Sequence, residues 1–319
     1  MGFLRFSFAV LFLVPLTLPN SQTTLSAQTR DAGLTMMTVT LTDRRGNYVM
    51  GLTSDAFKVT DESRVVPVKL FGVIDEPMSI GILVDTSSSM QQPEAKEVAR
   101  PKPIGEAVVR FLELANTENE YFLMAFDESP RVLVDWNKAK ELSNQKITMT
   151  EAKKMTALYD SCFAAIEKLK DAHRAKRALI LFSDGLDSTS KRRYLELRRL
   201  LRGTDVVLYA IAPRISYNRS DILALFGSAL NREGQEVLVE LAQITGGAVF
   251  YPENKEQLNR VVDQIAIETR HQYRIGFQAG TAGVADKWHR IRVKVEPPLA
   301  APSEFRKLTV RTRQGFYSQ

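Results

Sequence analysis

The chain of 319 residues has one cysteine, Cys162, and only three histidines, His173, His271 and His289. A disulfide within the chain is excluded because it needs two cysteines. Zinc modules built on four cysteines, or on two cysteines and two histidines, are excluded for the same reason. The histidines are also too few and too scattered for a histidine-rich zinc site. A metal site in this chain would therefore rely on oxygen donors, which suit a harder ion.

Long apolar stretches are also scarce, and no segment after the N-terminal region is long and apolar enough to span a membrane. Residues 1–19 read MGFLRFSFAVLFLVPLTLP, with one positive charge at Arg5 and then an apolar run to Leu18. This pattern is typical of a secretory signal peptide, because a membrane span needs about 20 apolar residues. We predict a signal peptide over residues 1–27 and an exported chain, periplasmic or secreted. An uncleaved membrane anchor is the alternative.

The charge balance is modestly positive, with 43 Lys and Arg residues against 37 Asp and Glu residues and a net charge of +6. Hydrophobic residues make up 44% of the chain and charged residues 25%, which is an ordinary globular composition. Lys191–Arg202 is strongly basic, and charge alone would allow it to bind nucleic acid. Glu196 interrupts this segment, however, and an exported protein meets little nucleic acid. We predict a solvated basic face and no nucleic-acid partner, with attraction to acidic partners or anionic surfaces as the intermediate alternative.

The apolar pattern divides the chain into three regions. Residues 34–75 read as short alternating strands around a turn cluster at 42–47. Between Ser79 and Arg270, buried strands alternate with helical stripes, which predicts a mostly parallel sheet with helices on both faces. Within this region, the four-residue turn in 121–136 is too short for a helical crossover and predicts an antiparallel hairpin. After residue 270 the chain returns to alternating strands.

The two outer β segments are each about 45 residues long, which is marginal for an independent fold. We therefore predict an α/β fold class, in which a doubly wound sheet is inserted in a small β-sandwich-like domain. The predicted parts are an N-terminal β segment over 28–77, an α/β domain over 78–270 and a C-terminal β segment over 271–319. The expected strands are 34–41, 57–60, 65–74, 79–84, 121–126, 131–136, 178–182, 206–212, 248–251, 273–278, 289–295 and 307–312, and the expected helices are 104–115, 158–169, 191–202, 236–244 and 258–265.

Two of the buried strands are followed by aspartates, Asp85 and Asp184. In open α/β sheets, ligands bind at the carboxyl ends of the strands. Asp85 opens a D-x-S-x-S run, in which the hydroxyls of Ser87 and Ser89 can fold back round a cation that the aspartate helps to hold. Magnesium prefers oxygen ligands, few carboxylates and several retained waters. One carboxylate and two hydroxyls from a single loop suit that demand.

The D-x-S-x-S run resembles the metal-ion-dependent adhesion site of von Willebrand factor type A domains, and the resemblance covers about residues 78–270. Thr156 opens T-A-L-Y-D, which is similar to the threonine loop of the family, and Asp184 lies in F-S-D-G, which is similar to its third loop. The resemblance implies a six-stranded sheet with one antiparallel edge strand. It also implies a metal held by Asp85, Ser87, Ser89, Thr156 and Asp184. The chain departs from the family at 153–155, where Lys-Lys-Met stands in place of the usual glycine before the threonine.

The outer segments resemble those of exported bacterial, acidobacterial-type proteins of the same family. In this family a coordination position stays open for an Asp or Glu carboxylate of a partner protein. The resemblance therefore implies a metal-dependent adhesion or assembly protein that uses Mg²⁺, or Mn²⁺ or Ca²⁺, and associates with the cell envelope. We expect binding and not catalysis.

The sequence leaves two alternatives open. One is a structural envelope protein in which the metal only stabilises the fold. The other is a hydrolase that uses Asp85, although no second carboxylate follows two residues later and neither a G-x-S-x-G nor a G-x-x-x-x-G-K motif is present. Cys162 lies on an apolar helical stripe and is expected to be a buried structural thiol. Asp127 is expected to be a turn residue, and Asp187 a helix cap or surface residue. The connection 213–234 is expected to be a partner-contacting excursion or a disordered insertion.

Overall fold

The structure of the chain is a computed structural model, and its described residues from Leu34 onward belong to one compact unit. The predicted signal peptide, residues 1–27, and the two lysines of the 153–155 segment lie outside the described residues. Side chains are described throughout these ranges except at positions 73, 89, 102 and 223–231. The described ranges are 34–73, 75–90, 102–143, 155–213, 223–279, 287–298, 305 and 307–318.

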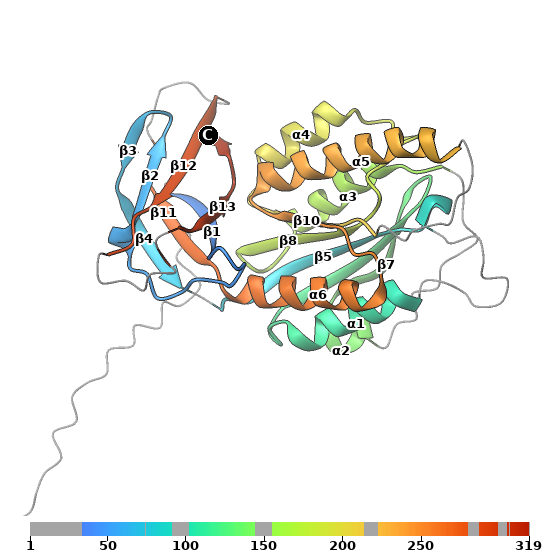
Figure 1. Ribbon diagram of the computed structural model, residues 1–319, viewed down its shortest axis with the longest axis horizontal. Helices are drawn as coiled ribbons and strands as arrows, with labels where there is room; N and C mark the ends of the chain where they lie inside the picture. The colour runs from blue at the N-terminus through green and yellow to red at the C-terminus, as the bar shows by residue number, and fades with distance from the viewer. Residues whose placement is uncertain are drawn as a thin grey trace, which may run out of the picture. The chain divides into compact units, whose positions relative to one another are not determined.

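A six-stranded sheet forms the centre of the α/β part, with strand order β10-β9-β8-β5-β6-β7 (Figure 1). All eight residues of β5 are buried, as a strand covered on both faces requires. β5 pairs in parallel with β6 and β8, and β7 returns antiparallel to β6 at the edge of the sheet. The predicted hairpin and the predicted six-stranded sheet are thereby confirmed. The strands are β5 (Met78–Asp85), β6 (Glu120–Phe126), β7 (Pro130–Asn137), β8 (Lys176–Phe182), β9 (Val207–Ile211) and β10 (Ala248–Phe250).

Helices cover both faces of this sheet, with α1 and α6 on one face and α3, α4 and α5 on the other (Figure 1). Alternate residues of β5 serve the two faces: Ile80 and Ile82 pack in the core under α1 and α6, whereas Leu83 packs in the core under the opposite helices. This arrangement confirms the predicted fold class. The helices are α1 (Lys102–Leu114), α2 (Ala139–Ser143), α3 (Leu158–Lys170), α4 (Tyr194–Arg202), α5 (Leu223–Thr245) and α6 (Lys255–Arg270).

The N- and C-terminal segments pair with one another in two four-stranded sheets, ordered β13-β1-β11-β4 and β14-β12-β2-β3. Residues of both segments share one core, with Val39 and Val59 from the first and Tyr273 and Phe277 from the second. The predicted sandwich is thus present, whereas its boundaries at residues 77 and 270 stay predictions. The strands are β1 (Thr35–Thr42), β2 (Phe57–Asp61), β3 (Arg64–Val66), β4 (Val68–Val73), β11 (Tyr273–Phe277), β12 (Trp288–Val295), β13 (Thr309–Thr312) and β14 (Gly315–Tyr317), and the short 3-10 turns are η1 (Ser54–Ala56) and η2 (Ser88–Met90).

The expected single strand over 65–74 is wrong, because β3 and β4 belong to different sheets. Val66 pairs with Val59 of β2, whereas Val68 pairs with Phe277 of β11. Pro67 lies between them, and proline has no amide hydrogen to donate to a ladder. The chain therefore changes sheets at this residue.

Two helices of the α/β part also differ from the expected bounds. The backbone of α5 is helical from Leu223, so it includes part of the connection expected over 213–234; residues 214–222 lie outside the described residues. α4 begins at Tyr194 and not at Lys191. The amides of Lys191 and Arg192 both donate to the Asp160 carboxylate of α3, at 2.9 Å each. These contacts hold the two residues in the loop before the helix.

Several arginines of α4 contact other parts of the protein, whereas a solvated basic face was expected. Arg198 pairs with Glu240 of α5 at 2.6 Å. Arg199 lies over the ring of Tyr317, and Arg202 lies 4.9 Å from the ring centroid of Trp288. The contacts of Arg199 and Arg202 attach α4 to the C-terminal strands of the sandwich.

A buried carboxylate, Glu268 of α6, joins the α/β part to the sandwich. It is fully buried and accepts hydrogen bonds from the hydroxyls of Thr40 at 3.2 Å, Tyr48 at 3.0 Å and Tyr209 at 2.9 Å. Arg311 of β13 forms an ion pair with the same carboxylate. These partners come from both the α/β part and the sandwich. The buried charge of Glu268 is therefore compensated only when the two parts are packed together.

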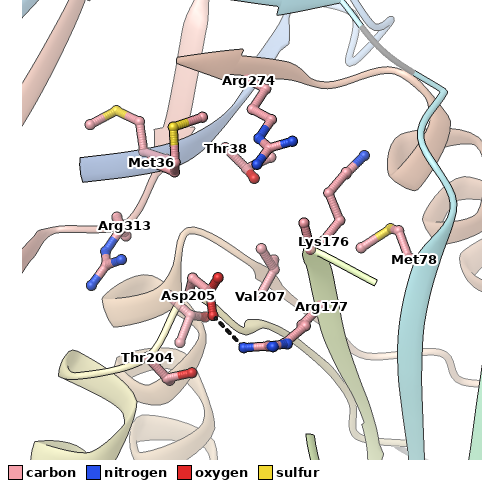
Figure 2. A pocket seen from close by; sticks show the side chains of 13 residues that line it. Met36, Thr38, Met78, Lys176, Arg177, Thr204, Asp205, Val207, Arg274 and Arg313 are labelled. Atoms are coloured by element: carbon pink, nitrogen blue, oxygen red, sulfur yellow. Dashed lines mark ion pairs between the residues drawn. The ribbon is translucent and has the colours of Figure 1, made fainter. Parts of the chain in front are cut away.

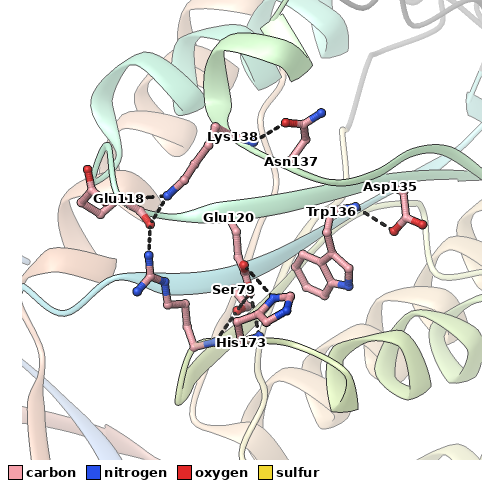
Figure 3. A network of polar contacts seen from close by, with 9 residues as sticks. Ser79, Glu118, Glu120, Asp135, Trp136, Asn137, Lys138 and His173 are labelled. Carbon is pink, nitrogen blue, oxygen red and sulfur yellow. Dashed lines mark hydrogen bonds and ion pairs between the residues drawn. The ribbon is translucent and has the colours of Figure 1, made fainter. Parts of the chain in front are cut away.

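A second polar network closes the amino end of the parallel strands (Figure 3). Glu120 of β6 accepts hydrogen bonds from the Ser79 hydroxyl of β5 and from the His173 amide, the latter at 2.8 Å. The Nδ1 atom of His173 lies 3.1 Å from the other carboxylate oxygen. Although partial burial acts to raise the pKa of Glu120, these hydrogen bonds hold it below its usual value. The network ties β5, β6 and the loop before β8 together.

Among the helices described, none combines the length and the apolar character that crossing a membrane requires.

Candidate functional site

Asp85 lies at the carboxyl end of β5, the strand between β6 and β8 in the sheet. Its side chain is fully buried. One carboxylate oxygen, Oδ1, accepts the Ser87 amide at 2.9 Å, and the other, Oδ2, accepts the Ser183 hydroxyl at 2.9 Å. Two neighbouring loops, after β5 and after β8, thus hold the carboxylate in one orientation.

The electrostatic surroundings of Asp85 favour a cation. The pKa of Asp85 is raised to about 7, mainly by burial and also by the nearby charge of Asp184, against the opposing effect of the hydrogen bonds from Ser87 and Ser183. Within the described ranges, neither aspartate forms an ion pair with a lysine, arginine or histidine. A buried carboxylate beside a second carboxylate is costly without a compensating positive charge. A small hard cation fits this donor set better than any protein group described nearby.

The loop after β5 is folded by its own hydroxyl residues. Both the amide and the hydroxyl of Thr86 donate to the Phe126 carbonyl of β6, at 2.8 and 2.9 Å. The chain then turns through η2, and the side chain of Ser87 is buried beside Asp85. Ser89 lies in η2 by its backbone, but its side chain lies outside the described residues.

Asp184 follows β8, and a tight loop presents it. Its Oδ1 atom accepts the Leu186 amide at 3.0 Å. Gly185 has φ +87°, a conformation that L residues rarely adopt, and a Cβ atom there would lie 2.1 Å from the Gly234 carbonyl oxygen of α5. A Cβ atom at Gly234 would lie 2.5 Å from the Asp184 carbonyl oxygen. The loop that carries Asp184 therefore lies directly on the backbone of α5.

Thr156 lies at the same edge of the sheet and is held by two other loops. Its amide donates to the Ser188 hydroxyl at 2.8 Å, and its carbonyl accepts the Ser188 amide at 2.8 Å. The amide of Ala157 donates to the Asp127 carbonyl at 2.6 Å. Backbone contacts therefore place Thr156 between the loops that follow β6 and β8, and its side chain is buried.

The structure thus brings Asp85 and Ser87 into direct contact, places Asp184 close enough to act on the charge of Asp85, and fixes Thr156 at the same edge. That these residues, with Ser89, ligate a metal stays a prediction. In the part of the chain that the structure describes, no three His, Cys, Asp or Glu side chains gather as metal ligands would. A cation at this edge would therefore depend on hydroxyls in addition to carboxylates.

Sequence reasoning missed Ser183, whose hydroxyl donates to Asp85, and Gly234, which the Asp184 loop needs for its close approach. Ser183 stands directly before Asp184, so a small hydroxyl residue at a strand end was the available signal. Gly234 is far away in sequence and carried no such signal.

The other residues considered from the sequence have structural roles. Asp187 accepts the Tyr159 amide in the first turn of α3 at 3.2 Å, whereas the N-cap residue of that helix is Ala157. Asp127 lies in the turn after β6 and pairs with Arg131 at 2.7 Å. Cys162 is buried, as expected, and burial raises the pKa of its thiol above the usual value.

Comparison with known families identifies one matching model, the von Willebrand factor type A domain, over residues 80–186. This stretch runs from β5 to the loop after β8 and contains Asp85, Ser87, Thr156 and Asp184. No curated protein matches the chain.

Three solved structures are similar to the chain at low sequence identity. An aerotolerance-related membrane protein from Bacteroides fragilis is 13% identical, with 60% of this chain and 98% of that chain covered and a TM-score of 0.43. Proximal thread matrix protein 1 from the mussel byssus is 15% identical, with 66% and 50% covered and a TM-score of 0.49. The ArnB paralog VWA2 from Sulfolobus acidocaldarius is 14% identical, with 90% and 76% covered and a TM-score of 0.44.

Proposed function

The α/β part of this chain contains a von Willebrand factor type A domain, and from that premise we propose that the protein binds an acidic side chain of a partner protein through a divalent cation. The observation that carries the proposal is the arrangement of Asp85. Its carboxylate is buried, oriented by Ser87 and Ser183, close to Asp184, and paired with no cationic side chain among the described residues.

Asp85, Ser87, Ser89, Thr156 and Asp184 would hold the cation, which we propose is Mg²⁺, with Mn²⁺ or Ca²⁺ as substitutes. Bound there, the cation would supply a Lewis-acidic position for an Asp or Glu carboxylate of the partner. The protein contributes two carboxylates and three hydroxyls, so most of its donors carry no charge. Because three of the five donors are neutral hydroxyls, the cation would stay electrophilic towards an incoming acid.

Binding and not catalysis is the role that these contacts favour. Both carboxylate oxygens of Asp85 already accept hydrogen bonds from within the protein, which suits a fixed ligand better than a nucleophile. The single thiol, Cys162, is buried in the core of the sheet. We also propose that the protein is exported to the periplasm or the exterior and associates with the envelope, because residues 1–19 have the pattern of a signal peptide.

Thermal unfolding with and without Mg²⁺, Mn²⁺ or Ca²⁺ tests the metal. A ligand at 100 times its Kd stabilises a protein by about 2.7 kcal/mol, which should raise the Tm of a chain of this length by about 4 °C. We expect this increase in Tm in the wild type and its loss in Asp85→Ala. We expect the same loss in Asp184→Ala, which changes a less buried side chain. Asp61→Asn is the matched control, because Asp61 is a buried aspartate of the sandwich that contacts His289 at 3.0 Å. An unchanged metal-induced increase in both site variants would contradict the proposal.

Capture of partners from an envelope extract, with and without EDTA, separates the proposal from its alternatives. Capture that requires the cation and fails in Asp184→Ala supports metal-dependent binding. Capture that ignores EDTA favours a structural protein in which the metal only stabilises the fold. Hydrolysis of generic phosphate or ester substrates that disappears in Asp85→Ala would instead favour an enzyme.

A further inference from the structure

A cavity of about 250 Å³ lies at the other end of the parallel sheet, between the α/β part and the sandwich (Figure 2). Met78 and Lys176, the first residues of β5 and β8, lie on its wall. Asp85 ends β5 seven residues later, about 23 Å away along an extended strand. The cavity is therefore separate from the candidate metal site.

Two cationic side chains on the wall of this cavity contact only neutral oxygens. The ammonium group of Lys176, which is 8% exposed, donates to the Thr269 carbonyl at 3.1 Å. The guanidinium of Arg313 donates to the carbonyls of Gly315 at 2.7 Å and Arg202 at 3.1 Å. Within the described ranges, neither side chain has a carboxylate at ion-pair distance.

Burial disfavours the charged form of both side chains and so lowers their pKa values. Burial lowers the pKa of Lys176 to about 8 and lowers the pKa of Arg313 from its usual value, because the loss of water outweighs the attraction of Glu76 and Asp75 on Lys176 and of Asp205 on Arg313. Buried lysines and arginines are normally paired with a negative group. The described side chains on the wall of the cavity therefore carry more positive than negative charge.

Two further arginines add to this charge. Arg177 lies 3.5 Å from Asp205, the only carboxylate on the wall, and its Nε atom is buried without a hydrogen-bond partner among the described residues. Arg274 pairs with Glu76 at 3.0 Å. In Figure 2, Lys176, Arg177, Arg274 and Arg313 surround the same space. Among the described residues, the wall carries four cationic side chains and one carboxylate.

The rest of the wall combines three threonines with apolar side chains, of which the methionines are the most adaptable. Met36 and Met78 line the cavity from opposite parts of the chain, and methionine fits irregular ligand surfaces because its side chain is flexible and polarisable. At about 30 Å³ for each water, the volume corresponds to about eight water molecules. A ligand that fills it would therefore have about eight non-hydrogen atoms.

We propose that this cavity binds a small organic anion, with its carboxylate attracted by the cationic side chains of the wall, Lys176 among them, and its short apolar body against the methionines. Inorganic phosphate would satisfy the charge but leave the methionine wall uncovered. A neutral molecule of the same size would cover the methionines but leave the cations without a partner. The inference does not depend on the proposed metal site.

Calorimetric titration of the full chain with hexanoate, which has about the required size, tests the proposal. The neutral alcohol hexanol and inorganic phosphate are titrated in parallel. We expect hexanoate to bind, and its affinity to fall at least tenfold in Lys176→Met. Arg177→Met, at the more exposed edge of the cavity, should weaken binding as well and provides a second test if Lys176→Met does not fold. Lys294→Met is the control, because this exposed lysine lies on β12 of the sandwich.

Carbon-13 labelling of the methionine methyl groups locates the ligand. We expect hexanoate to shift the NMR signals of Met36 and Met78 and to leave that of Met124, in the core under the opposite face, unchanged. Absence of hexanoate binding would overturn the proposal, as would binding that neither Lys176→Met nor Arg177→Met weakens. Phosphate or hexanol binding as tightly as hexanoate would also overturn it, because the ligand would then not need both a charge and an apolar body.

Discussion

Lys176 gives the sharpest test of the electrostatics derived from this structure. Its ammonium group is buried, donates to the Thr269 carbonyl and has no ion pair within the described part of the chain. Methionine keeps a similar unbranched side chain but removes the charge. We expect Lys176→Met to change how the stability of the protein depends on pH, in addition to its level at any one pH.

The expected size of the change in stability follows from the pKa of Lys176. Burial lowers the pKa of Lys176 from 10.5 to about 8, against the attraction of Glu76 and Asp75 and with a small additional effect of Arg274. Because the pKa is lower in the folded state, the unfolded chain holds the proton more tightly, and the charged lysine destabilises the fold below about pH 8. At about 1.4 kcal/mol for each pH unit, the difference amounts to about 3 kcal/mol. This penalty is lost between about pH 8 and 10.5, so wild-type stability rises there relative to the variant.

Urea unfolding of both proteins between about pH 7 and pH 10 measures the effect. We expect the unfolding free energy of Lys176→Met minus that of the wild type to fall by about 2–3 kcal/mol over this range. The variant lacks the hydrogen bond to Thr269, and this loss should shift the difference in unfolding free energy by the same amount at every pH. Titratable groups common to both proteins cancel from the difference. Lys294→Met, at an exposed position, should show a flat difference. A difference for Lys176→Met that varies by less than about 0.5 kcal/mol would refute the reasoning.

Two further substitutions test the contacts that hold the parts of the protein in place. Glu268→Ala leaves the Arg311 charge without its carboxylate, so we expect a loss of about 3–5 kcal/mol in urea unfolding, and a loss below about 1 kcal/mol would contradict the role of Glu268. Gly234→Val should displace the loop of Asp184 and remove the Mg²⁺-induced rise in Tm although it changes no proposed ligand. Gly203→Ala is the control and should retain that rise, because a Cβ atom there comes no closer than 3.5 Å to its neighbours. A rise retained in Gly234→Val would show that the close approach of α5 does not position Asp184.

Local patterns in the sequence predicted most of the elements. The continuous apolar run before Asp85 predicted a buried strand, and every residue of β5 is buried. The short turn within 121–136 predicted the hairpin of β6 and β7, because four residues cannot form a crossover. Both predictions depend on spacing within a few residues of the chain, and the sequence contains that spacing. The same reasoning placed Asp85 and Asp184 at one edge of the sheet.

Contacts between distant residues required the folded chain. Ser183 approaches Asp85 only because β8 lies beside β5, and Gly234 receives the Asp184 loop only because α5 covers that edge. The cavity at Lys176 likewise exists only where the sandwich meets the amino ends of the strands.

The sequence by itself determined the alternation of strands and helices, the oxygen-rich loop that starts at Asp85 and the absence of cysteine and histidine sites. Hydrophobic period and residue chemistry are local properties, so no folded contact was needed to infer them. Only the tertiary structure decided that Asp85 is buried against a second loop and that Lys176 is buried without a carboxylate partner in the described ranges. Burial and charge pairing depend on which distant segments meet, and that is what sets the pKa of each group.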